Sequence, residues 1–434
     1  MRGGMAASVT QALALLAVVV LAVLVAVHAD PGARELAVYA DNNASTPAFP
    51  EVVQAVASVT AACYANPSSV HALGRRSREL LDACRRRFAE LLGARQCEVV
   101  FTSGATEANN AAIRGLFAAQ RASGGGGGGA PRRRFRVVTS NVEHASVYQT
   151  LRSLPEREAE TVPVPVGPDG RLPPEAVVEA LEAAPTDMVC VILANNEVGT
   201  IQDIAPVAEA CRARGVHLHL DVTQVVGRYP LDLHALGCDT ATLSAHKFHG
   251  PKGVGALFVR DGVRFDACAT GGGQEMSWRS GTENLAGIRG AVVALERCAA
   301  ELASGGDARV RAMRDHVEAA LLAGLPPGGV RVNGAGGARL YNTLSVSFPG
   351  VNSRAQLVPA LDEARVYVNV GCACSQGKPS ATLQALGLTP EEQQGSIRVS
   401  FGFMNTPQEA RKLARALLAA VRLARAAPAA APPS

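Results

Sequence analysis

Aromatic residues are scarce in this sequence, at 4% of 434 residues, and only one residue is tryptophan. Apolar residues nevertheless make up 48% of the chain and charged residues only 18%, so alanine, valine and leucine can form a large buried core. At about 100–200 residues per domain, the length predicts two or three domains.

The chain also lacks a strong net charge, because 42 basic residues leave an excess of only +4 over 38 acidic ones. So weak an excess does not favour nucleic-acid binding, and we expect no nucleic-acid partner. The densest basic clusters are short. We expect 85–87 on an exposed helix face and 132–134 in a loop.

The ten cysteines show neither a disulfide framework nor a paired CxxC zinc pattern. Several lie inside apolar segments, as Cys190 does within 188–192, where a free cysteine behaves as a small buried hydrophobe. We therefore expect the core to fold in a reducing compartment.

The N-terminus lacks charge altogether: residues 3–29 carry none, and the sixteen residues from Ala12 to Val27 are all apolar. This length lies between a signal-peptide core and a full membrane span. The segment is neither arginine-rich nor amphipathic, unlike a mitochondrial presequence. We expect residues 1–35 to be a signal peptide or membrane anchor, attached to a catalytic region of cytoplasmic or organellar type. A buried helix is the alternative.

Beyond residue 36, short β-branched segments alternate with longer helical patterns. The expected buried strands are 98–101, 136–139, 189–193, 217–220, 240–243 and 255–259. Helices are expected at 77–92 and at 174–184, the second with proline in its first turn. This alternation predicts an α/β fold with a mostly parallel sheet, where ligands bind beyond the carboxyl ends of the strands.

The pattern changes near residue 300, where a helix over 308–322 leads into a strand at 342–348. We therefore predict a large domain followed by a smaller C-terminal α+β domain and a frayed tail, at 36–290, 291–426 and 427–434. The glycine run at 124–129 predicts a surface loop.

The sharpest chemical motif is Ser244-Ala245-His246-Lys247, directly after a strand. A lysine here suits a cofactor aldehyde, with which its amine forms a Schiff base, while the hydroxyl and imidazole reach a phosphate. An exposed loop lysine is more often only solvated, so the motif needs support from other residues.

That support comes from Asp221, which ends another expected strand. An unpaired carboxylate is costly there, and the protonated pyridine nitrogen of pyridoxal 5'-phosphate (PLP) is a suitable partner. Gln224 lies three residues on and could bond the ring hydroxyl oxygen. The alternative is that Asp221 caps the next helix.

Two further motifs fit the same cofactor chemistry. Residues 101–107 run from a strand through Gly104 into a helix, which predicts either an anion site at the helix N-terminus or plain N-capping. Residues 371–378 form a loop of small and polar residues that carries Cys372 and Cys374. A thiol on such a loop is a candidate nucleophile, with a C-x-C metal pair as the alternative.

Together with 141–144, 194–199 and 279–282, these motifs give the chain a clear resemblance. It resembles the class V, fold-type I PLP enzymes, and specifically the cysteine desulfurase and selenocysteine lyase family. The resemblance extends from 39–47 to 396–402 and implies a large domain with a mostly parallel seven-stranded sheet.

The resemblance implies a role for each matching residue around the ring. Lys247 matches the Schiff-base lysine, Asp221 the pyridinium partner and Gln224 the contact to the ring oxygen. His144 matches the histidine that stacks on the ring and transfers protons. Asn196 matches the asparagine near ring and substrate.

Other matches concern the phosphate, the substrate and the partner subunit. The phosphate cup corresponds to Ala105, Thr106, Ser244 and His246. Thr282 matches a phosphate contact supplied by a neighbouring subunit, which implies a homodimer. Arg398 matches the arginine that clamps the substrate carboxylate. Cys374, and not Cys372, falls on the catalytic cysteine.

The activity implied is removal of sulfur from L-cysteine, giving L-alanine and a Cys374 persulfide that supplies an acceptor protein, as in iron–sulfur cluster or thio-cofactor assembly. The alternative is a selenocysteine lyase, which residues 188–199 and 246–251 resemble; the loop 374–378 is closer to cysteine desulfurases. Two alternative functions belong to other classes of protein. A class V aminotransferase would not need Cys374, and a non-catalytic membrane-tethered scaffold would not need Lys247.

Overall fold

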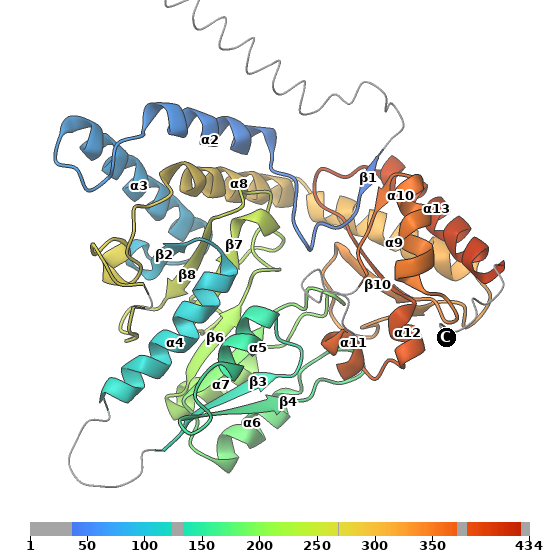
Figure 1. Cartoon of the computed structure of the whole chain (residues 1–434), viewed down its shortest axis with the longest axis horizontal. Helices are drawn as coiled ribbons and strands as arrows, with labels where there is room; N and C mark the ends of the chain where they lie inside the picture. The colour runs from blue at the N-terminus through green and yellow to red at the C-terminus, as the bar shows by residue number, and fades with distance from the viewer. Residues whose placement is uncertain (1–36, 124–132, 268, 371–379, 427–434) are drawn as a thin grey trace, which may run out of the picture. The chain divides into compact units, whose positions relative to one another are not determined.

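The computed structural model of the protein (Figure 1) describes residues 37–123, 133–267, 269–370 and 380–426. From Val38 onward the chain forms one compact unit. Within the described ranges, no helix combines the length and the apolar character needed to cross a membrane.

Several predictions fall outside the described residues: the segment 1–35, the glycine run, the tail 427–434, and the loop with Cys372 and Cys374. The boundary predicted at residue 290 falls within helix α8 (Leu285–Ala303) and stays a prediction.

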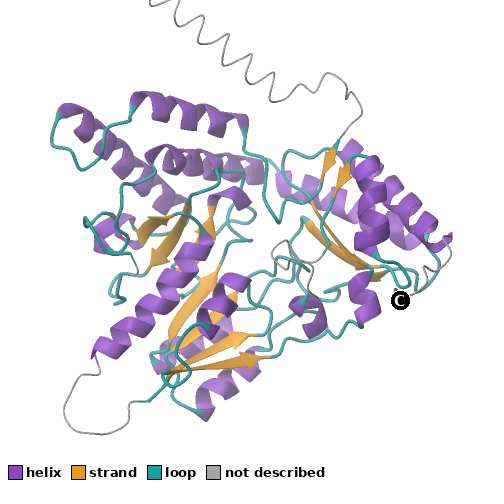
Figure 2. Cartoon of the chain, viewed as in Figure 1, coloured by secondary structure: helices purple, strands orange, loops and turns teal. Residues whose placement is uncertain are grey.

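The α/β fold with a mostly parallel sheet is confirmed (Figure 2). Seven strands lie in the order β2-β8-β7-β6-β5-β3-β4. They are β2 (Val99–Thr102), β3 (Phe135–Ser140), β4 (Ala159–Val164), β5 (Met188–Ile192), β6 (His217–Asp221), β7 (Thr240–Ser244) and β8 (Gly255–Val259). Pairing is parallel from β7 to β4, whereas β8 runs antiparallel to both neighbours.

All six expected strands are present in this sheet, and β4 is its one strand that the sequence pattern did not predict. It forms the sheet edge beside β3 and contains Pro163. An edge strand tolerates a residue without an N–H, and its half-exposed side chains give no buried apolar run.

The two faces of the sheet are covered by different helices because side chains alternate along each strand. Val137 and Cys190 pack with residues of α4 (Ala105–Ser123) and α5 (Ala145–Arg152). Val138 and Val189 belong to the larger cluster on the other face, with α6 (Pro174–Ala183) and α7 (Ala205–Arg214). Beyond them, α2 (Pro50–Ala62), α3 (Ala72–Leu91) and α8 pack together (Figure 1).

A second, three-stranded antiparallel sheet, β12-β10-β9, follows in the C-terminal part. Its strands are β9 (Arg331–Val332), β10 (Thr343–Ser347) and β12 (Ser396–Ser400). Helices α9 (Gly306–Gly324) and α13 (Pro407–Ala426) pack on each other beside it. The shorter elements are β1 (Val38–Tyr39), β11 (Val366–Tyr367), α10 (Val358–Glu363), α11 (Ala381–Ala385) and α12 (Pro390–Gln394).

The expectation that 85–87 forms an exposed basic face is wrong for its first residue. Arg85 is buried and makes two hydrogen bonds to the Glu275 carboxylate, at 2.6 and 2.5 Å. A third goes to the Val99 carbonyl at 2.7 Å. The sequence could not reveal this pair, because its members lie 190 residues apart.

Candidate active site

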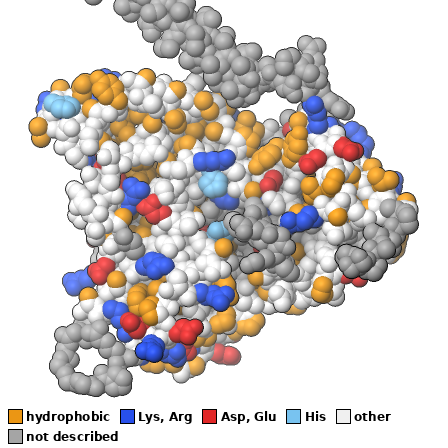
Figure 3. Space-filling model, viewed as in Figure 1, with side chains coloured by type: hydrophobic (Ala, Val, Ile, Leu, Met, Phe, Trp, Pro, Cys, Tyr) orange, Lys and Arg blue, Asp and Glu red, His pale blue; other side chains and the backbone are white. Residues whose placement is uncertain are grey.

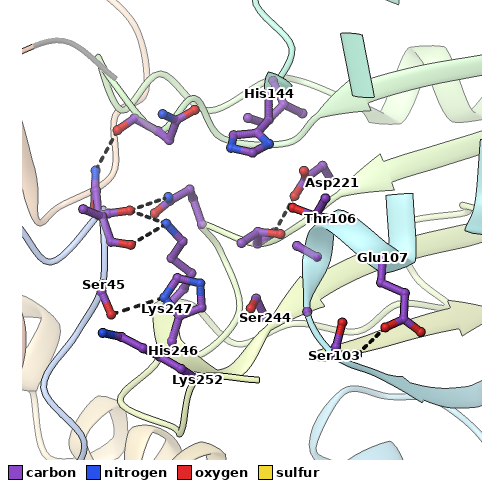
Figure 4. Close-up of a pocket in the computed structure, with 18 of the residues that line it drawn as sticks. Ser45, Ser103, Thr106, Glu107, His144, Asp221, Ser244, His246, Lys247 and Lys252 are labelled. Carbon is purple, nitrogen blue, oxygen red and sulfur yellow. Dashed lines mark hydrogen bonds between the residues drawn. The ribbon is translucent and has the colours of Figure 1, made fainter. Parts of the chain in front are cut away.

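A cavity of about 480 Å³ opens at the carboxyl ends of three adjacent strands (Figure 4). The last residue of each strand lines it: Ile192 of β5, Asp221 of β6 and Ser244 of β7. The cavity brings together ten of the residues predicted from sequence: Ala105, Thr106, His144, Asn196, Asp221, Gln224, Ser244, His246, Lys247 and Arg398.

Lys247 enters this cavity from the short helical turn that follows β7. Its Nζ donates to the carbonyls of Asn43, at 2.6 Å, and Ala44, at 2.9 Å. Burial lowers the pKa of the neighbouring His246 to about 4, and the Lys247 charge adds to this. His246 is therefore neutral at pH 7 and can serve a phosphate only through a hydrogen bond.

Asp221 is almost completely buried at the end of β6, with 3% of its surface exposed. Its Oδ1 accepts the Thr223 N–H at 3.0 Å, and its Oδ2 accepts from Asn109 Nδ2 at 3.0 Å. Turns follow it rather than a helix, so helix capping does not explain it. Among the described residues no lysine or arginine pairs with this carboxylate, so a cationic ligand atom would supply the missing partner.

The N-terminus of α4 forms another wall of the cavity, where Ala105 and Thr106 begin the helix. The first N–H groups of a helix lack intrahelical acceptors and favour an anion. Gly255 of β8 packs directly behind, where a Cβ would come within 2.6 Å of the Gly104 Cα. The glycine pair therefore lets strand and helix start lie close together beside Ser244.

Arg398 approaches the cavity from β12 and is buried, with 3% exposed. Its Nη2 donates to Asp41 Oδ1 at 2.6 Å, and its Nη1 donates to the Asn196 carbonyl at 2.9 Å. Its Nε has no hydrogen-bond partner within the described part of the chain. An unsatisfied guanidinium donor in a cavity wall suits a carboxylate ligand.

His144 and Gln224 are each held in one orientation. His144 precedes α5, and its Nδ1 accepts the Ser146 N–H at 3.1 Å. Gln224 Nε2 donates to the Asn43 carbonyl at 3.1 Å, while its Oε1 accepts from Arg228 Nη1 at 2.5 Å. The Gln224 N–H₂ group is therefore the end that faces away from Arg228.

Two predicted site residues are not placed in this cavity. Thr282 is exposed and lines a separate cavity of about 100 Å³ with Arg279 and Glu283. Cys374 lies outside the described residues.

Sequence reasoning missed two residues that shape the site. The backbone carbonyl of Asn43 accepts from both Lys247 and Gln224. Arg228 is buried and orients Gln224. Asn43 lies in the 39–47 segment on which the resemblance rests, but a backbone acceptor leaves no signal in its own side chain.

The match to known families decides the identity of the fold. Residues 38–413 match the family model described as aminotransferase class-V. The chain belongs to the class V aminotransferase family. A cysteine desulfurase of Cereibacter sphaeroides is 41% identical over 88% of this chain and 94% of its own length. The cysteine desulfurase IscS of Methanosarcina thermophila is 35% identical over 86% of this chain and 89% of its own.

Solved structures of this family share the same fold. A NifS-like protein covers 89% of this chain at 30% identity, with a TM-score of 0.80. A NifS-like protein from Rickettsia africae covers the same share at 29% identity and a TM-score of 0.78. Each is matched over its whole length, so the class V members and this chain share one complete α/β architecture.

The residues of the cavity fit PLP, on which this family depends. Lys247 would hold the aldehyde carbon, Asp221 the protonated ring nitrogen, and Ala105, Thr106 and Ser244 the phosphate. The fit rests on one unmet demand in the described residues, the buried Asp221 carboxylate that pairs with no lysine or arginine.

Proposed function

We propose that this protein is a PLP-dependent cysteine desulfurase that converts L-cysteine to L-alanine and passes the sulfur to Cys374 as a persulfide. The observation that carries the proposal is the single cavity that unites Lys247, Asp221 and Arg398. The relatives named as cysteine desulfurases favour cysteine over selenocysteine as substrate.

The side chains of the cavity divide the work. When bound, PLP supplies a carbonyl for the substrate amine and an electron-accepting ring. Arg398 binds the substrate carboxylate through its guanidinium fork. Lys247, held between two carbonyls, takes the proton from the substrate Cα. Asp221 would keep the proton on the ring nitrogen, and His144 would relay protons within the cavity.

The sulfur step balances with a single protein thiol. The Cys374 thiolate attacks the substrate sulfur, the carbon–sulfur bond breaks, and a sulfur–sulfur bond forms on Cys374. The carbon skeleton leaves as L-alanine after protonation. Transfer of the outer sulfur to an acceptor protein restores the thiol.

A side-by-side assay tests substrate choice. The purified protein, loaded with PLP, is given L-cysteine or L-selenocysteine, and sulfide, selenide and alanine are measured with a thiol reductant present. We expect alanine and sulfide in equal amounts from cysteine. Selenide release with no alanine from cysteine would assign the protein to the lyases instead.

Replacing Arg398 with lysine should raise KM for cysteine by roughly 30-fold or more, because the buried fork is lost. PLP affinity should stay within about twofold, since Arg398 faces the substrate rather than the cofactor. Arg331→Lys, on β9 of the same sheet and paired at the surface with Glu392, is the matched control. Equal KM values in the two variants would remove the substrate role.

We propose a homodimer in which Thr282 completes the partner's site. Exposed apolar side chains support this: Tyr64 is 75% exposed and Val70 88%, and both lie in the segment between α2 and α3. Figure 3 shows apolar side chains gathered over these helices. Sedimentation should find a dimer. Thr282→Val should weaken PLP binding about tenfold, while the molecular mass of the assembly measured by sedimentation stays that of a dimer. A fully active monomer would contradict the shared site.

We also propose that residues 1–35 target or anchor the protein rather than take part in catalysis. A variant lacking them should be soluble, with turnover within about twofold of the full chain. Turnover and the circular dichroism spectrum check this. An unfolded product would show that the segment belongs to the core.

A further inference from the structure

We infer that Asn109 is a positioning residue that holds Asp221 and His144 in their working orientations. Asn109 lies on α4, one turn beyond the residues that begin the helix, and none of its surface is exposed. Its meaning for catalysis rests on the proposed function, but its geometry does not.

Both amide hydrogens and the oxygen of Asn109 have hydrogen-bond partners. Its Nδ2 donates to Asp221 Oδ2 at 3.0 Å and to Ser146 Oγ at 2.8 Å. Its Oδ1 lies 2.8 Å from His219 Nε2. The reverse orientation would set an oxygen against the Asp221 carboxylate, two acceptors facing each other, so only one orientation is stable.

This orientation of the Asn109 amide determines which ring nitrogen carries the hydrogen in His219 and in His217. Because Asn109 Oδ1 can only accept, His219 Nε2 carries the hydrogen, and neutral His219 Nδ1 must accept. Thr240 Oγ1 lies 2.9 Å from that Nδ1 and therefore donates its single hydrogen to it. His217 Nε2, 2.9 Å from the same hydroxyl, must then donate. In this series of hydrogen bonds, each donor lies farther from Asp221 than its acceptor.

Burial supports the neutral histidines that this logic requires. It lowers the pKa of His219 to about 3 and that of His217 to about 4, although Asp221 and Asp239 respectively oppose these shifts. His217 also lines a second cavity, of about 510 Å³. The hydrogen-bonded series thus runs from that cavity along one face of the sheet to the Asp221 carboxylate.

The second amide hydrogen of Asn109 leads to His144. Ser146 Oγ accepts it and lies 2.7 Å from His144 Nδ1, to which the Ser146 hydroxyl donates. The Ser146 N–H serves the same Nδ1. Because Nδ1 accepts, the ring hydrogen of His144 lies on Nε2. One amide consequently orients both the carboxylate that would pair with the ring nitrogen and the imidazole assigned to proton relay.

Nitrogen-15 NMR of histidine-labelled protein tests the network directly, with and without PLP. We expect His144, His217 and His219 to carry their ring hydrogens on Nε2 in both states. A hydrogen on Nδ1 of His219 would overturn the inference. Absence of any PLP binding would instead refute the proposed function while leaving the tautomer result valid.

A pair of variants tests what the network does. Glutamine can place its Nε2 where His219 has its own, whereas leucine cannot donate to Asn109. We expect His219→Leu to raise the PLP dissociation constant about tenfold and to shift the pH dependence of the bound cofactor's visible absorbance. His219→Gln should restore both to within about twofold of the wild type.

A second pair of variants, on strand β7, tests Thr240 and controls for the loss of a buried hydroxyl group. Thr242 is also buried on β7, and its hydroxyl has no partner in the described structure. Thr240→Val should weaken PLP binding, whereas Thr242→Val should not. Equal effects of these two substitutions, or of His219→Leu and His219→Gln, would reduce the network to a purely structural role.

Discussion

Replacing Lys247 with alanine is expected to abolish turnover, by at least about 10³-fold, and to remove the visible absorbance of covalently held PLP. Lys247 lines the cavity together with the buried Asp221 and Arg398. Its position between the Asn43 and Ala44 carbonyls would be lost with the side chain. Absorbance spectra and alanine formation from cysteine measure the two effects.

Lys412→Ala is the matched control, because Lys412 lies on α13 and does not line the cavity. It should match the wild type in both spectrum and rate. A Lys247→Ala variant that turns over cysteine within about tenfold of the wild type would place the base and the cofactor attachment elsewhere.

The second large effect concerns the thiol. Cys374→Ser should reduce alanine and sulfide formation from cysteine by at least about 10³-fold, because serine cannot accept sulfur. PLP binding should be unchanged, so the visible spectrum should persist. With selenocysteine we expect a smaller loss, because a selenolate leaves more readily than a thiolate.

The residues that flank the cysteine loop support this assignment. Asn369 Nδ2 donates to Asp41 Oδ2 at 2.8 Å, and Asp41 also binds Arg398. On the other side, Ser380 Oγ donates to Glu197 Oε2 at 2.6 Å. Both flanks are therefore tied to residues next to the predicted substrate clamp.

Cys372→Ser is the matched control for the thiol, since it removes the neighbouring sulfur of the same loop. It should retain most activity. Mass spectrometry after a cysteine pulse should locate the extra sulfur on Cys374. A persulfide found only on Cys372, with Cys374 dispensable, would move the acceptor by two residues.

The sequence predicted the cavity wall well because its residues follow strand ends. Asp221 and Ser244 each close a buried β-branched or apolar strand, and the turn after β7 carries Lys247. Parallel pairing of β5, β6 and β7 then brings these ends together without any further information.

What the sequence did not predict depends on contacts between distant segments. The ion pair of Arg398 with Asp41 joins residues that lie 357 positions apart in the sequence. The hydrogen bond from Asn109 to Asp221 joins residues 112 positions apart. Edge strand β4 escaped prediction because its half-exposed face breaks the apolar pattern. Arg85 was misjudged because its partner Glu275 lies 190 residues away in the sequence.

The most direct test of cysteine desulfuration is a single turnover with one equivalent of L-cysteine and no reductant. Alanine is quantified by chromatography, and the persulfide is located by mass spectrometry of the intact protein and its peptides. We expect one alanine for each persulfide, with the persulfide on Cys374. Transfer of the amino group to a 2-oxo acid, with cysteine sulfur left on the carbon skeleton, would show an aminotransferase and contradict the assignment.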